Sequence, residues 1–227
     1  MINDTSSIGK IDFNTSGEIL SHEDALVTPS RKIVPVRRRA DAVQNRTKLL
    51  DAAELVFLEE GVNASLDLIA ERAGVGRATL FRNFADRGAL TLALLDRAVA
   101  ELEEEAALIS NDPLALGRLL HFMAKRIIMR APLNEIWMTL EHDHPALIAA
   151  LVRVGAVFEK PVAWAVAGGA CRSDFMESDV ILLVSMLRGA LYARSPDVRR
   201  KMVERGWDLV CEAARLNGAP ASLEESA

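Results

Sequence analysis

The stretch from Ser65 to Arg87, SLDLIAERAGVGRATLFRNFADR, constrains the fold of this chain more than any other. It predicts two short helices joined by a tight turn, the helix-turn-helix arrangement that lays its second helix in the major groove of DNA. Ser65 is expected to cap the first helix. Gly74 is expected to end it, because glycine adopts the left-handed conformation without strain. The second helix is expected to begin at Gly76 or Arg77.

The spacing of apolar residues separates the buried face of this helix pair from its outward face. On the first helix the buried residues are expected to be Leu66, Ile69, Ala70 and Ala73. On the second helix Leu80 and Phe84 fall on one side. The remaining positions of the second helix are expected to face outward and to suit DNA: Arg77, Ala78, Thr79, Phe81, Arg82 and Asn83.

A longer stretch, LLDAAELVFLEEGVNASLDLIAERAGVGRATLFRNFADRGAL, resembles the N-terminal domain of TetR-type transcriptional regulators. The resemblance covers about residues 44–92, where glycines, small residues and aromatics fall at the family's spacing. The matching positions are Ala52, Ala53, Phe57, Gly61, Ile69, Ala70, Ala73, Gly74, Val75, Thr79, Leu80 and Phe84. The chain departs from the pattern at Phe81, Asn83 and Gly76, where the family often has Tyr, His and Ser.

The resemblance implies an all-α protein with two domains. Residues 44–92 are expected to form the DNA-binding domain, with the helix from Gln44 to Glu60 packed across the helix-turn-helix. Residues 93–218 are expected to form a larger helical domain for ligand binding and dimerisation. Segments 1–43 and 219–227 are expected to be a flexible arm and a flexible tail.

The distribution of charge agrees with DNA binding by the N-terminal part alone. The chain has a net charge of −5. Residues 31–97 carry twelve basic and nine acidic side chains, whereas the segments on either side are each net −4. Only the segment with the helix-turn-helix is therefore positive, as contact with phosphates requires.

Arg46, Ser65 and Arg87 complete the expected DNA-binding residues, and Arg46 is included because it lies near the start of the first helix, although exposed cations are common on any helix. Arg87 stands where the family usually has a lysine that contacts phosphate. The run Arg37 to Arg39 is either a basic arm that reaches DNA or a solvated charge run ahead of a helix, and the sequence leaves both open.

Two further sets of residues are expected in the larger domain. Those on the helices that enclose an effector pocket in the family are His121, Phe122, Met123, Arg126, Trp137, Met138, Phe158 and Trp164, although such residues also describe a plain helical core. The last two helices carry more apolar surface than their own domain needs, which predicts a homodimer. The expected interface residues are Ile181, Val184, Ser185, Arg188, Leu191, Val203, Trp207 and Val210; close packing within one subunit is the alternative.

Catalytic, metal and membrane chemistry find little support in the sequence. Cys171 and Cys211 have no partner in metal or disulfide spacing, which fits a reducing cytoplasm. His121, His142 and His144 are poorly spaced for a metal. No catalytic residues, cofactor, metal site or membrane span are expected.

These observations predict a cytoplasmic, TetR-like repressor that binds a palindromic operator in double-stranded DNA as a homodimer. A small-molecule effector of unknown identity is expected to release it. One alternative is a ligand-independent regulator or activator, and a more distant one is an all-helical enzyme.

Overall fold

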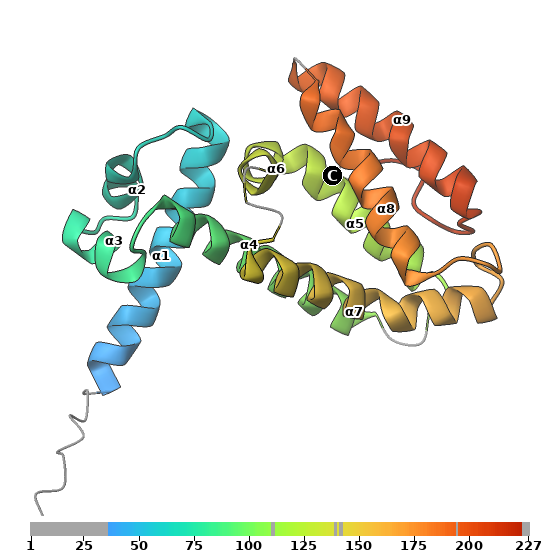
Figure 1. Cartoon of the computed structure of the whole chain (residues 1–227), viewed down its shortest axis with the longest axis horizontal. Coiled ribbons are helices and arrows are strands. Elements are labelled where there is room, and N and C mark those ends of the chain that lie inside the picture. The colour runs from blue at the N-terminus through green and yellow to red at the C-terminus, as the bar shows by residue number, and fades with distance from the viewer. Residues whose placement is uncertain (1–35, 110–111, 139, 141–142, 194, 224–227) are drawn as a thin grey trace, which may run out of the picture.

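The computed structural model of this chain describes residues 36–109, 112–138, 140, 143–193 and 195–223, with side chains from residue 41 onward. Every regular element in those residues is helical, which confirms the predicted all-α class. The elements are α1 (Val36–Glu60), α2 (Leu66–Arg72), α3 (Arg77–Asn83), α4 (Arg87–Leu108), α5 (Ala115–Met129), α6 (Ala131–Met138), α7 (Pro145–Ala167), α8 (Glu177–Arg188), the 3-10 helix η1 (Gly189–Tyr192) and α9 (Pro196–Ala214). Figure 1 shows α1–α3 at one end, α8 and α9 at the other, and α4 running between them.

The helices α1–α3 and the first half of α4 enclose a small apolar core. Phe57 of α1 and Phe84 after α3 are fully buried in it, as the spacing of apolar residues predicted. Leu133 and Ile136 of α6 belong to the same core. The N-terminal domain is therefore joined to the rest of the molecule by α6 as well as by α4.

The helix α1 begins at Val36, eight residues before the expected start at Gln44. Arginine, alanine and glutamine all favour helices, and this propensity extends α1 although the apolar spacing stops. The expected flexible arm over 1–43 is thus wrong for residues 36–43, and residues 1–35 lie outside the described part of the chain. The backbone of Arg37 to Arg39 is helical, but their side chains lie outside the description.

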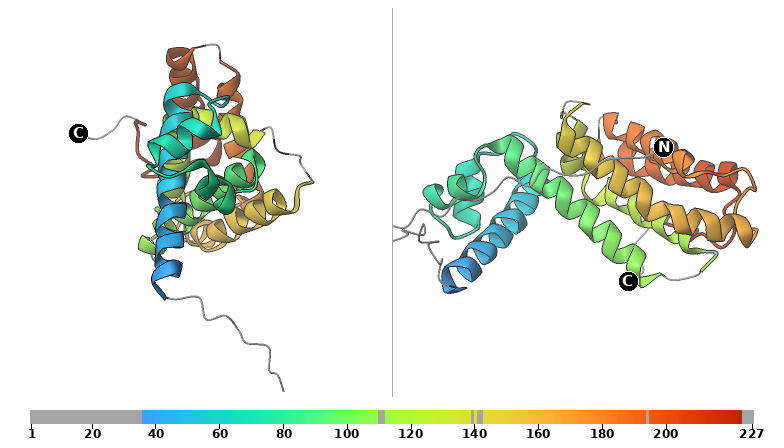
Figure 2. Two further views of the ribbon diagram at one scale, coloured as in Figure 1. Left: turned by 90° about the vertical axis from the view of Figure 1, so that its left-hand side faces the viewer. Right: turned by 60° about the horizontal axis from the view of Figure 1, so that its bottom comes forward.

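The helices α5, α7, α8 and α9 pack around a second, larger core. Leu116, Phe158 and Trp207 are among its fully buried side chains. The helices α8 and α9 approach each other closely at Gly206, where an added Cβ would lie 2.8 Å from Cδ2 of Leu187. Figure 2 shows α7 lying along α4, and Arg153 of α7 ties the two helices through Glu103 at 2.7 Å.

The chain after α9 also differs from the expectation. Ser195 caps α9 by accepting from the N–H of Val198, and the helix ends at Ala214 with Arg215 in the left-handed conformation (φ 52°). The indole N–H of Trp207 donates to the carbonyl of Pro220 at 2.9 Å, and Leu223 is buried. The expected flexible tail over 219–227 is therefore wrong for 219–223. This segment supplies the acceptor that the buried indole N–H needs, and it buries the apolar side chain of Leu223. Residues 224–227 lie outside the description.

Candidate nucleic-acid interface and interior cavity

The helix α3 presents a basic, exposed face that its buried side holds in place. Leu80 and Phe84 anchor it, with only 1% and 2% of their surfaces exposed. Gly74 ends α2 at φ 66° and Ser65 caps α2 by accepting from the N–H of Leu68 at 3.1 Å, as predicted. The outward residues are Arg77, Ala78, Phe81 and Arg82, which are exposed, and Thr79 and Asn83, which are partly exposed. The expected inward and outward faces of α3 are confirmed.

The polar groups of α3 are held by weak contacts that a ligand can replace. Arg77 forms an exposed ion pair with Asp67 of α2 at 3.0 Å and lies over the ring of Phe81. Arg82 donates to the hydroxyl of Thr79 at 2.8 Å. Exposed ion pairs contribute about 0–1 kcal/mol, so Arg77 can exchange Asp67 for an anion at little cost.

Arg46 of α1 lies at the C-terminal end of α3. Its Nη1 donates to the carbonyl of Asn83 at 3.3 Å, and its guanidinium lies 4.5 Å from the ring centre of Phe84. The structure thus brings Arg46 to the same surface as Arg82 and Asn83. Ser65 lies instead at the start of α2, where its hydroxyl oxygen is already an acceptor.

Arg87 has structural contacts that sequence reasoning did not anticipate. Its guanidinium donates to the carbonyls of Val62 and Ala64 and lies over the ring of Phe57. It therefore fastens the first turn of α4 to the link between α1 and α2. The helix N-terminus beside it is capped by Asp86, whose carboxylate accepts from the N–H of Ala89 at 2.8 Å. A contact of Arg87 with phosphate stays a prediction.

Replacing Arg87 by alanine is expected to lower the free energy of unfolding by roughly 2–4 kcal/mol, because two partly buried carbonyls lose a charged donor. Urea unfolding followed by circular dichroism measures the change. Arg82→Ala is the matched control, since that guanidinium is exposed, and its effect is expected to stay within about 0.5 kcal/mol. Equal losses in the two variants would contradict the fastening role of Arg87.

A cavity of about 570 Å³ lies in the larger domain, between α4, α5, α6, α7, α8 and η1. Five of the eight expected pocket residues line it: Phe122, Met123, Arg126, Trp137 and Met138. The lining also includes polar residues that sequence reasoning missed, namely Arg130, Asn134 and Tyr192. Arg130 follows Arg126 by one helical turn, a spacing that could have indicated the shared face.

The other three expected pocket residues lie elsewhere. The ring of His121 packs against Trp207 with ring centres 5.5 Å apart, and its Nε2 is 2.7 Å from the carbonyl of Ser222. Phe158 belongs to the core of the larger domain, and Trp164 is not part of the cavity wall. The error has a physical cause: α5 is covered on two sides, so that His121 faces α9 while Phe122 faces the cavity.

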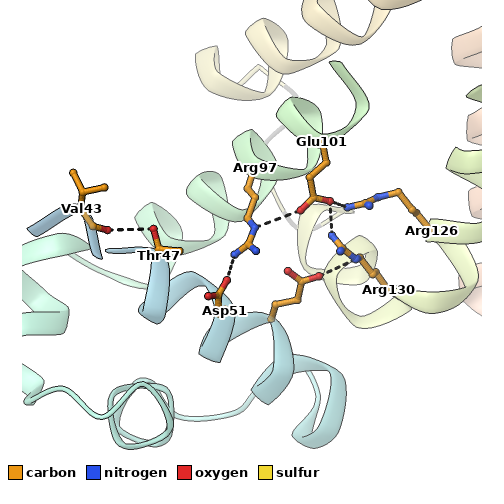
Figure 3. Close-up of polar contacts among 8 residues, drawn as sticks. Val43, Thr47, Asp51, Arg97, Glu101, Arg126 and Arg130 are labelled. Carbon is orange, nitrogen blue, oxygen red and sulfur yellow. Dashed lines mark hydrogen bonds and ion pairs between the residues drawn. The ribbon is translucent and has the colours of Figure 1, made fainter. Parts of the chain in front are cut away.

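A network of arginines and carboxylates leads from the cavity to α1 (Figure 3). Arg126 and Arg130 of the cavity wall both bind Glu101 of α4. Arg130 also binds Glu54 of α1 at 2.8 Å. Arg97 of α4 completes the network by binding Asp51 of α1 at 2.5 Å and Glu101 at 3.4 Å, so α4, α5 and α1 are held together beside the cavity.

Half of the residues expected at the dimer interface are covered within the subunit itself. Leu191, Val203, Trp207 and Val210 are buried within their own subunit. Ile181, Val184, Ser185 and Arg188 line the cavity. The four buried residues thus belong to the inward face of their segments, whereas Ile181 and Ser185 stay exposed. Large apolar side chains that stay exposed on these helices are Ile181, Leu182 and Met186 of α8, and Val198, Met202 and Leu209 of α9.

Other candidate chemistry has no matching geometry in the described residues. Burial raises the pKa of the Cys171 thiol, and burial with Asp208 nearby raises the pKa of Cys211 to about 11, so both thiols are protonated near neutral pH. His144 caps α7, His142 is not described, and no His, Cys, Asp and Glu cluster suited to a metal occurs in the described part of the chain. Within the same residues, no helix has the length and hydropathy to span a bilayer.

Comparison with known proteins bears directly on the helix-turn-helix. A sequence profile for bacterial regulatory proteins of the tetR family matches residues 49–94. An HTH-type transcriptional regulator of Staphylococcus aureus (strain bovine RF122 / ET3-1) is 40% identical over 60 residues, or 26% of this chain and 32% of that protein. The match thus spans about a third of the length of the curated relative.

Two solved structures are similar over most of the chain. The TetR transcription regulatory protein from Mycobacterium vanbaalenii is 25% identical with a TM-score of 0.58, and the match covers 78% of this chain and 98% of that one. A TetR transcriptional regulator from Streptomyces coelicolor is 29% identical with a TM-score of 0.55, over 76% of this chain and 99% of that one. The similarity therefore extends well beyond the helix-turn-helix.

Proposed function

We propose that this chain, which is similar to transcriptional regulators of the TetR family in its helix-turn-helix and in its fold, is a ligand-released repressor rather than an enzyme. It binds a palindromic operator in the cytoplasm as a homodimer, and a small molecule in the cavity weakens that binding. The observation that carries the proposal is the position of the cavity. Its wall is formed in part by α4 and α6, the two helices that also pack into the core of the N-terminal domain.

The proposed switch follows from this shared packing. A ligand that fills the cavity shifts α4 and α6 relative to α5, and the ion pairs of Glu54 and Glu101 pass the shift to α1. Two recognition helices of a dimer fit one operator only when they lie one DNA turn apart, about 34–36 Å. A change of a few ångströms in that separation lowers operator affinity without any change in α3 itself.

Arg77 is proposed to read a base, because it is the exposed cation at the start of α3 and its present partner is easily replaced. Arg77→Ala is expected to weaken operator binding by about 1–3 kcal/mol and to relax the preference at one base pair. Binding to a set of operators with single base changes, measured by fluorescence anisotropy at one salt concentration, tests this.

Arg87→Ala provides the comparison for this experiment. If Arg87 contacts phosphate, the variant weakens binding to all sequences alike and leaves base preference intact. Thr79 or Ala78 is proposed to meet a thymine methyl or a nearby phosphate, and Arg46, Ser65, Phe81, Arg82 and Asn83 complete the proposed DNA surface. A loss of base preference in both arginine variants would contradict the assignment of Arg77.

The function as a whole is tested by selecting bound fragments from genomic DNA with the purified protein. The expected result is a palindromic sequence bound by a dimer, with affinity that falls when a cavity ligand is added. Affinity that stays constant across a broad panel of small molecules would favour a ligand-independent regulator or activator. Fragments without a common sequence would contradict operator binding altogether.

A further inference from the structure

The cavity wall carries one positive charge that has no carboxylate partner. Three arginines line the cavity, Arg126, Arg130 and Arg188, and no Asp or Glu is among the described residues of its wall. Two carboxylates outside the wall neutralise the first two: Glu101 binds both Arg126 and Arg130, and Glu54 binds Arg130. Arg188, at the end of α8, forms no hydrogen bond or ion pair with any described residue. Burial lowers the pKa of its guanidinium, although an arginine remains charged at neutral pH.

Two residues that line the cavity also carry buried polar atoms without a partner. Three buried side-chain nitrogens of the described residues have no hydrogen-bond partner: Nε of Arg188, Nε1 of Trp137 and Nε of Arg199. The first two belong to residues that line the cavity. Arg199 lies outside it, and its guanidinium is bound to Glu135 at 2.9 Å. A buried donor without an acceptor is costly, so two such donors on residues that line one cavity indicate an acceptor supplied by a ligand.

Apart from the arginines and the neutral polar residues Asn134, Ser185 and Tyr192, most of the wall is apolar. Its apolar residues include Val99 and Leu102 of α4, Phe122 of α5 and Leu151 of α7. A ligand that satisfies this wall must therefore bury a hydrocarbon or aromatic body and place one charged acceptor at Arg188. A cationic ligand would meet an uncompensated guanidinium, and a neutral one would leave that charge unpaired.

We propose that the effector is an apolar molecule with one anionic group, a carboxylate or a group of equal charge, bound by Arg188, and that Trp137 of the same cavity wall offers it a further donor. This inference rests on the proposed function, because it names the class of ligand that acts at the same cavity. A guanidinium binds a carboxylate through two parallel hydrogen bonds, which explains why an arginine serves at this position.

The test uses three probes with the same ten-carbon chain: decanoate, 1-decanol and decylammonium. Binding to the full-length protein without DNA is measured by calorimetry at neutral pH. Decanoate is expected to bind about 10-fold to 100-fold more tightly than 1-decanol, the factor that a hydrogen bond to a charged group provides. Decylammonium is expected to bind more weakly than either.

Arg188→Gln is expected to remove the preference for decanoate over 1-decanol, and Arg188→Lys to restore part of it. The midpoint of thermal unfolding of unliganded Arg188→Gln is expected to stay unchanged or to rise, since an unpaired buried charge is removed. Arg118→Gln, an exposed arginine of α5 outside the cavity wall, is the control and should keep the preference.

Two results would overturn the inference: 1-decanol or decylammonium binding as tightly as decanoate, or a preference for decanoate that survives in Arg188→Gln. Failure of decanoate to bind at millimolar concentration would overturn it as well. Decanoate binding that leaves operator affinity unchanged would count against release by a ligand, while the charge preference of the cavity would stand.

Discussion

Replacing Met186 by glutamate is expected to dissociate the proposed homodimer and to weaken operator binding by at least about 100-fold. The side chain of Met186 is 61% exposed in the single subunit, and Leu182 one turn before it is 59% exposed. Burying a charge at this position in an interface has a high free-energy cost. A monomer binds only one half of a palindrome, so it loses the gain of 10²–10⁴ that two linked sites provide.

Sedimentation velocity at micromolar concentration measures the oligomeric state, and fluorescence anisotropy measures operator binding. Val152→Glu is the control, because Val152 is a similarly exposed apolar residue on α7, a helix outside the proposed α8–α9 interface. It should leave both measurements unchanged. A wild-type protein that sediments as a monomer would contradict the proposed homodimer. A Met186→Glu variant that remains dimeric would contradict the proposed position of its interface.

Replacing Glu101 by glutamine is expected to lower the free energy of unfolding by about 3 kcal/mol. Its carboxylate is the shared partner of Arg126, Arg130 and Arg97 (Figure 3). These side chains are about a fifth to a third exposed, so they are only partly screened by solvent. Without Glu101, Arg126 loses its carboxylate partner beside two other cations, which is the costly way to break an ion pair.

Urea unfolding measures this loss, and Glu104→Gln is the matched control, an exposed glutamate on the same helix. The control should change the free energy of unfolding by no more than about 0.5 kcal/mol. Added salt supplies a second check. Salt screens partly buried ion pairs less than exposed ones, so the loss of unfolding free energy in Glu101→Gln is expected to persist at high salt concentration. Similar unfolding curves for the wild type and Glu101→Gln would show that the network contributes little.

The N-terminal domain could be predicted in detail because its determinants are local. Ser65 caps α2, Gly74 ends it, and Leu80 and Phe84 are buried as their spacing indicated. Caps and turns depend on residues a few positions apart, and burial on one face follows from the helical period. The same logic misplaced the start of α1, since helix propensity continues after the apolar pattern has stopped.

The larger domain was predicted less well because each of its helices is covered on more than one side. On α8, Leu187 packs toward α9, Arg188 faces the cavity, and Met186 faces solvent. These three residues are consecutive in sequence, yet their side chains point in three different directions. An apolar period can reveal that a helix has a buried side, but it cannot assign that side to a core, a cavity or a second subunit.

The sequence by itself determined the all-α class, the helix-turn-helix and the outward face of α3, since each depends on contacts between residues close in the chain. Only the tertiary structure decided that Arg87 binds the carbonyls of Val62 and Ala64, that Glu101 gathers three arginines, and that Arg188 stands unpaired. The physical reason is that the partners of a charged side chain in a folded protein depend on the groups packed around it. Those surroundings are assembled from helices far apart in sequence, whose packing no local pattern specifies.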